Sequence, residues 1–497
     1  MGLNALDVAV IVVYLACVTL FGMRFRKQTG TLKGYFLAEN TIPWWAISLS
    51  IVAAETSTLT IISVPGMAYE RDFGFLQLVI GYLIGRVIIC ALLIPHYFRG
   101  ELVTAYQLIE RRFGQKLRTL TAGLFLITRA AAEGVRVFAV AIVVGIALSS
   151  FLGGLGDFAR DVAAIGIVSI LTLIYTFEGG MAAVIWTDVV QLAVYVTGTL
   201  VGFFTILHLV PGGWQTVQGM AAAAGKFRVF YFGWNFYKSY TFWSGLVGGA
   251  FLTTASHGTD QLIVQRLLSS RSERQAKLAL LASGVMVLFQ FSLFLLVGAM
   301  LFVFYRLFPP GMAFQRTDTI YPTFIVTRMP HGVSGLLISA ILAAAMANLS
   351  AALNSLSSTT IVDFYSRLNP QASEQCRVSL SRLATVGWAV VLFALAIVAR
   401  RGGRVLEAGL SIASVAYGSL LGVFLLGVLT RRATEEGAML GMLCGFGLNL
   451  YLWQYTRVPF TWYVALGSLA TFAVGYGASF LLGVPKMEIA AEASDGQ

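Results

Sequence analysis

Charged residues are scarce in this chain of 497 residues. They make up 11% of it, where a soluble globular protein has roughly 25%. Hydrophobic residues make up 58%, and the mean hydropathy is +0.80. Such a composition excludes a soluble globular protein, and it predicts a polytopic membrane protein that has the lipid bilayer as a partner.

Cysteines and enzyme motifs are scarce as well. The four cysteines are too scattered for a disulfide framework or a metal cluster. The chain has no phosphate-binding glycine loop before a lysine, no His-Glu-x-x-His and no nucleophile elbow. We therefore expect no enzyme, no organic cofactor and no metal other than a coupling ion. The net charge of +11 comes from basic residues in short loops between apolar segments, so a nucleic-acid partner is not expected either.

Long apolar segments fill most of the chain. Counting about 20 apolar residues per crossing, we expect thirteen transmembrane helices. The first is retained, because no cationic region or cleavage site accompanies it. The predicted helices lie near residues 5–25, 43–69, 75–97, 118–152, 160–177, 181–209, 240–268, 276–307, 333–366, 377–399, 403–429, 436–455 and 460–483.

These helices predict a peripheral first helix, ten core helices in two halves, and two C-terminal helices. Basic residues are more numerous in the loops that are cytoplasmic if the N-terminus is outside and the C-terminus inside. The predicted segments are 1–42 (first helix and cytoplasmic basic loop), 43–209 (first half), 210–239 (extracellular loop), 240–430 (second half), 431–484 (two C-terminal helices) and 485–497 (polar cytoplasmic tail).

Polar residues and helix-breaking residues interrupt the first core segment between Ser48 and Gly66. The stretch contains Glu55, a run of hydroxyl groups and the pair Pro65–Gly66. A carboxylate at membrane depth costs roughly 2.5–3.5 kcal/mol and usually faces a cavity or a partner. We predict a broken helix near Pro65–Gly66 that faces a binding site. The alternative is a packing stripe of small residues with a tolerated proline.

A second candidate break, in the sixth core helix, suggests internal symmetry. Gly248, Gly249 and Gly258 lie there with His257 between them. Interrupted segments at matching positions of two halves point to an inverted-repeat transporter with its site at the midplane. His257 either lines the pathway, where a proton-carrying role is open to it, or is a satisfied packing residue.

Ionisable groups also lie in the predicted third core helix. Arg129, Glu133 and Arg136 share one helical face, with one positive charge in excess. They form either a bracing ion-pair network or a receptor for an anionic group of the solute. Arg86 has no partner nearby in sequence and is a candidate partner of Glu55. Asp188 either coordinates a cation or caps its helix.

Five stretches together resemble the sodium:solute symporter family. They are Ser48 to Gly66, Thr104 to Gly114, Gly179 to Gln191, Gly258 to Arg266, and the helix that ends in Ser357–Ser358 before Asp363. The resemblance covers residues 5 to 430 and implies a LeuT-type fold with a 5+5 inverted-repeat core. It also implies sodium-coupled import by alternating access.

The resemblance implies a sodium site between the first and eighth core helices. Its carbonyl positions fall on Ala53, Thr56 and Ala344. The family's two adjacent hydroxyls fall on Ala347 and Asn348, which is a departure: Ala347 offers no side-chain oxygen and Asn348 offers an amide. A second sodium site found in some members falls on Asp188 and Ser350, so the stoichiometry is open.

The resemblance also implies a solute cavity. Its expected lining is Glu55, Ser57, Thr60, Gln77, Arg129, Arg136, Thr253, Ser256 and His257. The excess positive charge on the third core helix favours a small organic solute with a carboxylate, and a neutral sugar is the leading rival. Proton coupling is also open, as is a non-transporting membrane sensor of the same fold. The expected location is the plasma membrane, with a bacterial inner membrane favoured, and the oligomeric state is open.

Overall fold

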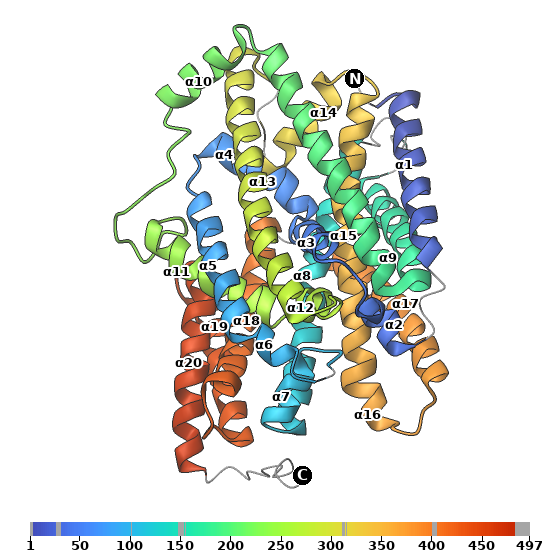
Figure 1. The fold of residues 1–497 in the computed structure, drawn as a ribbon. Helices are drawn as coiled ribbons and strands as arrows, with labels where there is room; N and C mark the ends of the chain where they lie inside the picture. The colour runs from blue at the N-terminus through green and yellow to red at the C-terminus, as the bar shows by residue number, and fades with distance from the viewer. Residues whose placement is uncertain are drawn as a thin grey trace.

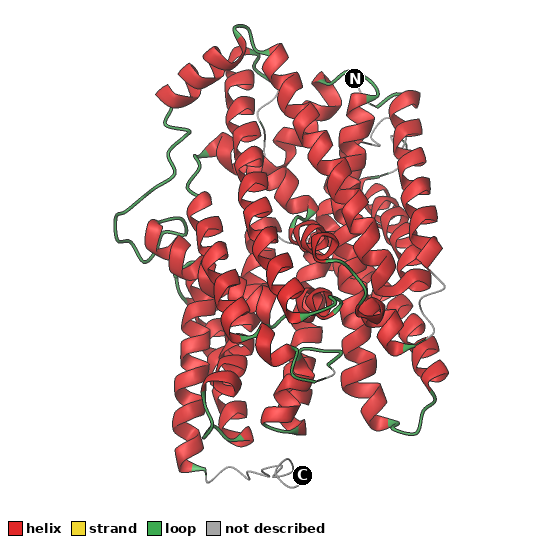
Figure 2. Ribbon diagram, in the orientation of Figure 1, coloured by secondary structure: helices red, strands yellow, loops and turns green. Residues whose placement is uncertain are grey.

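Helices make up the fold throughout the part of the chain that the computed structural model describes, which is residues 3–25, 31–100, 102–147, 154, 156–310, 314, 316–399 and 405–482 (Figure 2). In those residues one isolated bridge, between Ile42 and Ser270, is the sole β-type pairing. The elements are α1 (Ala5–Met23), α2 (Leu32–Leu37), η2 (Ala38–Asn40), α3 (Trp44–Glu55), α4 (Thr58–Glu70), α5 (Leu76–Leu92), α6 (Ile94–Tyr97), α7 (Tyr106–Arg112), α8 (Gln115–Ala147), α9 (Asp157–Leu209), α10 (Gly213–Ala223), α11 (Phe242–Gly258), α12 (Gln261–Leu268), α13 (Glu273–Leu307), η3 (Thr317–Thr319), α14 (Ile320–Arg328), α15 (Val333–Ser358), η4 (Thr359–Tyr365), α16 (Ser366–Leu368), α17 (Glu374–Ala399), α18 (Val405–Leu429), α19 (Glu435–Tyr455) and α20 (Phe460–Leu481).

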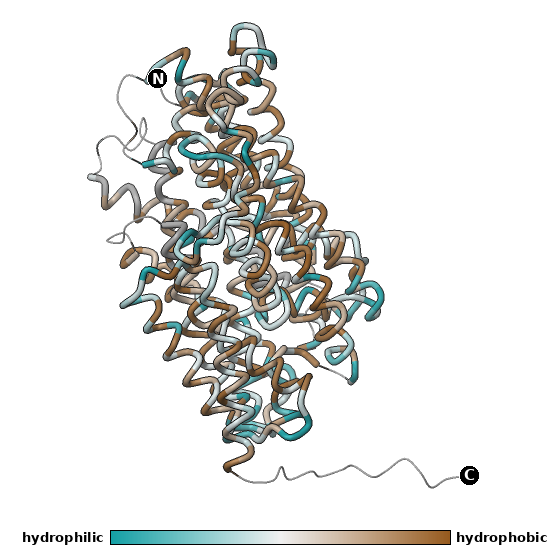
Figure 3. The backbone as a smooth tube through the Cα atoms, turned by 90° about the vertical axis from the view of Figure 1, so that its left-hand side faces the viewer, coloured by the Kyte–Doolittle hydropathy of each residue, from teal (hydrophilic) through white to brown (hydrophobic). Residues whose placement is uncertain are grey.

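The helices form one bundle, in which α1 begins at one end and α20 ends at the other (Figure 1). Apolar residues follow most of their length, and polar residues gather at the turns (Figure 3). Seven of the described helices are each long and apolar enough to cross a bilayer, and the bent pair α3–α4 makes an eighth. Helical structure lies in each of the thirteen predicted ranges. The all-helical membrane fold is thereby confirmed, while the count of thirteen crossings stays a prediction.

The helix bounds differ in several places from the predicted ones. Two predicted helices, 160–177 and 181–209, are joined in α9 across a kink at Gly180, whose φ of +54° suits glycine. Short helices α10 and α14 lie in the stretches 210–239 and 308–332, outside the predicted crossings, where short interfacial helices were open. The predicted polar tail, 485–497, lies outside the described residues, as do residues 400–404, which include Arg400, Arg401 and Arg404.

The first core span is broken, but not where the sequence predicted. α3 and α4 meet at a bend of 63° at Thr56 and Ser57, so the prediction of a break at Pro65–Gly66 is wrong in position. Thr56 has extended backbone angles, and its hydroxyl donates to Gln290 Oε1 on α13 at 3.1 Å. The Ser57 hydroxyl caps α4 by accepting from the Thr60 amide. The hydroxyl run therefore makes the break.

Pro65 and Gly66 instead form a close contact between helices. A Cβ built on Gly298 of α13 would lie 2.2 Å from the Pro65 carbonyl oxygen, and one on Gly66 would lie 2.5 Å from the Thr317 carbonyl oxygen. Both distances are too short for any side chain, so glycine is required for α4 to approach α13 and η3.

Gly298→Ala is expected to destabilise the protein by about 1–3 kcal/mol, because α4 and α13 would have to separate. Gly219→Ala is the matched control: Gly219 lies in the exposed helix α10 with open space around it, and alanine there is expected to stabilise by about 0.5–1 kcal/mol. The measurement is thermal unfolding of the detergent-purified protein. Equal stability of the two variants would contradict the close contact.

The sixth core span is broken near Gly258, as the sequence predicted. α11 ends at Gly258 and α12 begins at Gln261, with the Asp260 carboxylate accepting from the Leu262 amide at 2.9 Å as the cap. Gly248 and Gly249 lie inside α11, where Gly249 packs against the Leu78 carbonyl of α5. These two glycines are thus packing residues and take no part in the break.

Candidate functional site

A cavity lies where the two broken spans meet. The break residues of α3–α4 and α11–α12 line it together with α5, α8, α13 and α18. The space between its lining atoms, including space open to solvent, is about 980 Å³. The residues that line it are Ala54, Glu55, Ser57, Leu59, Thr60, Val64, Phe75, Tyr82, Arg129, Arg136, Leu252, Thr253, Ser256, His257, Asp260, Leu262, Ile263, Phe291, Leu410, Ala413 and Tyr417.

The structure brings together all but one of the residues that the sequence assigned to the solute. Glu55, Ser57, Thr60, Arg129, Arg136, Thr253, Ser256 and His257 line the cavity. Gln77 does not. Its amide nitrogen donates to the Gly74 and Tyr240 carbonyls at 3.0 and 3.3 Å, and its oxygen accepts from the Tyr231 amide at 3.0 Å. Gln77 therefore ties the loop before α11 to the start of α5.

Glu55 belongs to a compact ionic group on one side of the cavity. Arg86 Nη2 donates to Glu55 Oε2 at 2.5 Å, which is the pairing expected for Arg86. His257 Nε2 lies 3.3 Å from the same oxygen, and its Nδ1 lies 2.9 Å from the Ser256 hydroxyl. The charge of Glu55 is therefore neutralised by Arg86, and it presents no net charge to an anionic solute.

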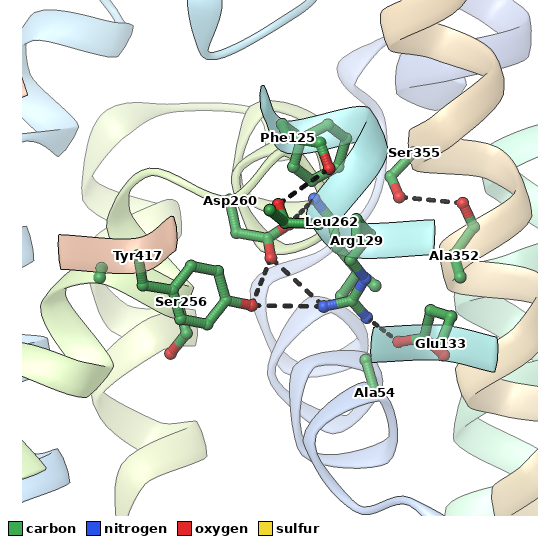
Figure 4. A network of polar contacts seen from close by, with 12 residues as sticks. Ala54, Phe125, Arg129, Glu133, Ser256, Asp260, Leu262, Ala352, Ser355 and Tyr417 are labelled. Carbon is green, nitrogen blue, oxygen red and sulfur yellow. Dashed lines mark hydrogen bonds and ion pairs between the residues drawn. The ribbon is translucent and has the colours of Figure 1, made fainter. Parts of the chain in front are cut away.

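A second ionic group in the cavity lining is centred on Arg129 of α8 (Figure 4). Arg129 is 6% exposed and contacts Glu133 Oε1, Asp260 Oδ2 at 3.3 Å and the Tyr417 hydroxyl at 3.4 Å. The Tyr417 hydroxyl donates to the same Asp260 oxygen at 2.6 Å. Arg129 is therefore held by two carboxylates, and it braces α8 against α12 and α18.

Arg136 is the more available arginine of this group. Its side chain is 20% exposed, and Nη1 donates to Glu133 Oε1 at 2.7 Å and to Asn348 Oδ1 at 3.5 Å. Because Asp260 also pairs with Arg129, the positive charge that the sequence predicted in excess on this helix is balanced, and Arg136 has Glu133 Oε1, which it shares with Arg129, as its carboxylate partner. The cavity wall thus offers one guanidinium for an anion.

Asp260 and Tyr417 were missed as cavity residues. Asp260 stands directly after Gly258 and Thr259, and its position at the start of a new helix was the available signal. Tyr417 lies in the apolar helix α18, and no feature of the sequence marks it. The apolar lining, which includes Phe75, Tyr82 and Phe291, was also not predicted.

The residues assigned to the sodium site between α3 and α15 are arranged differently from the implied pattern. Ala347 is buried and has no side-chain oxygen. Asn348 Nδ2 donates to the Ala54 carbonyl of α3 at 3.2 Å. The amide therefore turns its N–H toward the carbonyl end of α3, and its oxygen faces Arg136. For Ala53, Thr56 and Ala344 the site stays a prediction.

Asp188, the other residue assigned to sodium, is in a fully buried ion pair. Its Oδ2 accepts from Arg266 Nη2 at 2.9 Å and from the Ser50 hydroxyl at 2.5 Å, and both charged side chains are 0% exposed. The Ser350 hydroxyl donates to the Ala347 carbonyl of its own helix at 3.0 Å. The pair joins α9, α12 and α3, so the guanidinium of Arg266 already balances the charge of Asp188.

Comparison with known proteins decides the family. Residues 35–445 match the Sodium:solute symporter family. The chain belongs to that family. The sodium/sialic acid symporter SiaT of Proteus mirabilis (strain HI4320) is 30% identical to this symporter, over 95% of this chain and 94% of the relative. The sodium/sialic acid symporter NanT of Aliivibrio fischeri is 28% identical over 93% and 90% of the two chains. The sodium-coupled monocarboxylate transporter 2 of Homo sapiens is 26% identical over 87% and 69%.

Solved structures agree with the family. A substrate-bound, outward-open Na⁺-coupled sialic acid symporter superposes with a TM-score of 0.87 at 27% identity, over 97% of this chain and 99% of that one. A transporter of the nucleobase-cation-symport-1 family has the same fold, with a TM-score of 0.55 and 12% identity. This symporter is thus a multi-pass membrane transporter with a LeuT-like fold and not an enzyme.

Proposed function

We propose that this symporter imports a small carboxylate-bearing solute together with sodium, and that an acidic sugar of the sialic acid type is the first candidate. The observation that carries the proposal is Arg136, whose guanidinium faces the cavity with one shared carboxylate oxygen as its charged partner. A solute carboxylate can accept two parallel N–H bonds from such a group. Two relatives similar over nearly the whole chain are sodium/sialic acid symporters.

The rest of the lining suits a hydroxylated ring. Ser57, Thr60, Thr253 and Ser256 supply hydroxyl groups that can donate to and accept from sugar hydroxyls. Phe75, Tyr82 and Phe291 add flat apolar faces to the same lining. A neutral sugar, the leading rival, would leave Arg136 without a new partner, and it is therefore the second candidate.

Charge balance favours joint binding of an anion and a cation. Three guanidinium groups and three carboxylates form the two ionic groups of the cavity, so their formal charges cancel. A bound carboxylate adds one negative charge in a poorly hydrated site, and a bound sodium ion removes it. The proposed cycle is alternating access, with the N-terminus outside and the C-terminus in the cytoplasm. Ion and solute together stabilise one state over the other.

Thermal unfolding in detergent tests the proposal. Sialic acid, lactate and glucose are each added in sodium chloride and in choline chloride of equal ionic strength. A ligand at 100 times its dissociation constant stabilises by about 2.7 kcal/mol. We expect sialic acid to raise the unfolding temperature in sodium chloride and not in choline chloride. A rise with glucose and none with either acid would favour the neutral sugar.

A further inference from the structure

A second, smaller pocket adjoins the solute cavity between α8 and α15. Glu133 and Arg136 contribute its polar wall on α8, and Asn348 faces them from α15. Ser57 and Thr58, at the break of the first core span, also line it. Ser57 and Arg136 line both the pocket and the cavity. The pocket has room for about one water-sized species, and a dehydrated sodium ion is smaller.

Glu133 presents an unpartnered oxygen in this pocket. The side chain is 1% exposed. Its Oε1 accepts from both Arg129 and Arg136, whereas Oε2 is buried and has no hydrogen-bond partner among the described residues. Leaving a buried carboxylate oxygen without a partner is unfavourable, so this oxygen is available to a ligand.

Asn348 presents a second oxygen, Oδ1, toward Arg136. Because Nδ2 donates to the Ala54 carbonyl, Oδ1 lies on the opposite edge of the amide, toward Arg136. Exchanging the two atoms would set an oxygen against the Ala54 oxygen, which fixes the orientation. A carboxylate and an amide oxygen are the hard ligands that alkali cations take in proteins.

Arg136 spans the same two residues. Its Nη1 donates to Glu133 Oε1 and to Asn348 Oδ1, at 2.7 and 3.5 Å. The guanidinium thus supplies positive charge at the position where a cation would be held, and the same guanidinium is the one that reaches the solute cavity.

We infer that the coupling sodium ion binds between Glu133 and Asn348. Without the ion, the Arg136 guanidinium occupies this position, and it leaves when a solute carboxylate draws it into the cavity. The inference rests on the proposed function, since it takes sodium as the ion and a carboxylate as the solute. The inferred site lies between α8 and α15, whereas the family resemblance implied a site at the carbonyls of α3. Solute binding frees the ion's oxygens, and ion binding frees Arg136 for the solute. By linkage, each therefore raises the affinity of the other by the same factor.

Sodium titration of the full-length protein in detergent tests this exchange. Unfolding temperature is followed against sodium chloride, with choline chloride keeping the ionic strength constant, at a fixed sialic acid concentration. Glu133→Gln is expected to raise the half-saturating sodium concentration at least tenfold. Glu273→Gln is the matched control, because Glu273 forms an exposed i,i+4 ion pair with Lys277 on α13, and its titration is expected to match the wild type. If Glu133→Gln does not fold, Asn348→Ala replaces it in the test, and it is likewise expected to raise the half-saturating sodium concentration.

A variant of Arg136 gives an effect of the opposite sign and needs no solute. In Arg136→Gln the place-holding guanidinium is gone, so sodium alone is expected to stabilise the protein, at concentrations about tenfold lower than in the wild type without solute. The additional change Glu133→Gln is expected to abolish that gain. If sodium stabilises the wild type, and Glu133→Gln and Asn348→Ala give the same sodium titration as the wild type, the inference is overturned. The proposed function is unaffected by that result. A wild type indifferent to sodium under all solutes would instead overturn the proposed function.

Discussion

Replacement of Arg266 by methionine is expected to destabilise the protein by about 3–5 kcal/mol. Arg266 is fully buried and donates to Asp188, to the Ser50 hydroxyl at 2.8 Å and to the Leu262 carbonyl at 2.7 Å. Removing it leaves the carboxylate of Asp188 buried without a counter-charge. The measurement is the thermal unfolding midpoint in detergent.

A double variant separates loss of the pair from loss of packing. Asp188→Asn combined with Arg266→Met removes both charges, and it is expected to recover at least half of the lost stability. Lys277→Met breaks the exposed pair with Glu273 and is expected to cost about 0.5 kcal/mol or less. A double variant that is less stable than Arg266→Met alone would contradict a mainly ionic role for the pair.

The same variants test the assignment of Asp188 to sodium. If Asp188 serves to balance Arg266, the double variant keeps the sodium dependence of solute binding once its stability is restored. A loss of sodium dependence in a folded double variant would return Asp188 to the ion site that the family resemblance implied.

Replacement of Arg136 by glutamine is expected to raise the half-saturating solute concentration about 10- to 100-fold. The lost interaction is a hydrogen bond between charged groups, worth about 1.5–3 kcal/mol. Arg136→Lys keeps the charge without the planar fork, and it is expected to recover part of the affinity. The measurement is initial uptake of labelled sialic acid by proteoliposomes against solute concentration.

An arginine remote from the cavity serves as the control. Arg367 is near the end of α16 and donates to the exposed Thr119 hydroxyl at 2.9 Å. Arg367→Gln removes the same charge by the same change and is expected to leave uptake unaltered. If Arg136→Gln transports as well as Arg367→Gln, the carboxylate of the solute is bound elsewhere.

Much of the site could be predicted from the sequence because polar residues at membrane depth are few. Glu55, Arg129, Arg136 and His257 stand out in apolar segments, and all four line the cavity. Gln77 fails the same rule, because a polar residue near a helix start can serve the backbone of a loop as well as a ligand. Polar residues at membrane depth can thus be located from the sequence, but the sequence does not show which groups they contact.

The features that could not be predicted depend on three-dimensional pairing. Proline and glycine are the strongest signals of a break, yet Pro65 lies inside α4 and the break follows the hydroxyls of Thr56 and Ser57. The neutralisation of Arg129 by Asp260 joins residues 131 positions apart. The orientation of the Asn348 amide depends on a carbonyl of α3 that no local pattern reveals.

Accumulation of solute in proteoliposomes is the measurement that tests the central claim most directly. Purified protein is reconstituted, and labelled sialic acid is followed with sodium outside, with choline outside, and with sodium outside plus gramicidin to collapse the gradient. The solute concentration inside is expected to rise above the external concentration only with an intact sodium gradient, and to fall again after gramicidin is added. Binding without accumulation would indicate a sensor, and accumulation that ignores the sodium gradient would contradict sodium coupling.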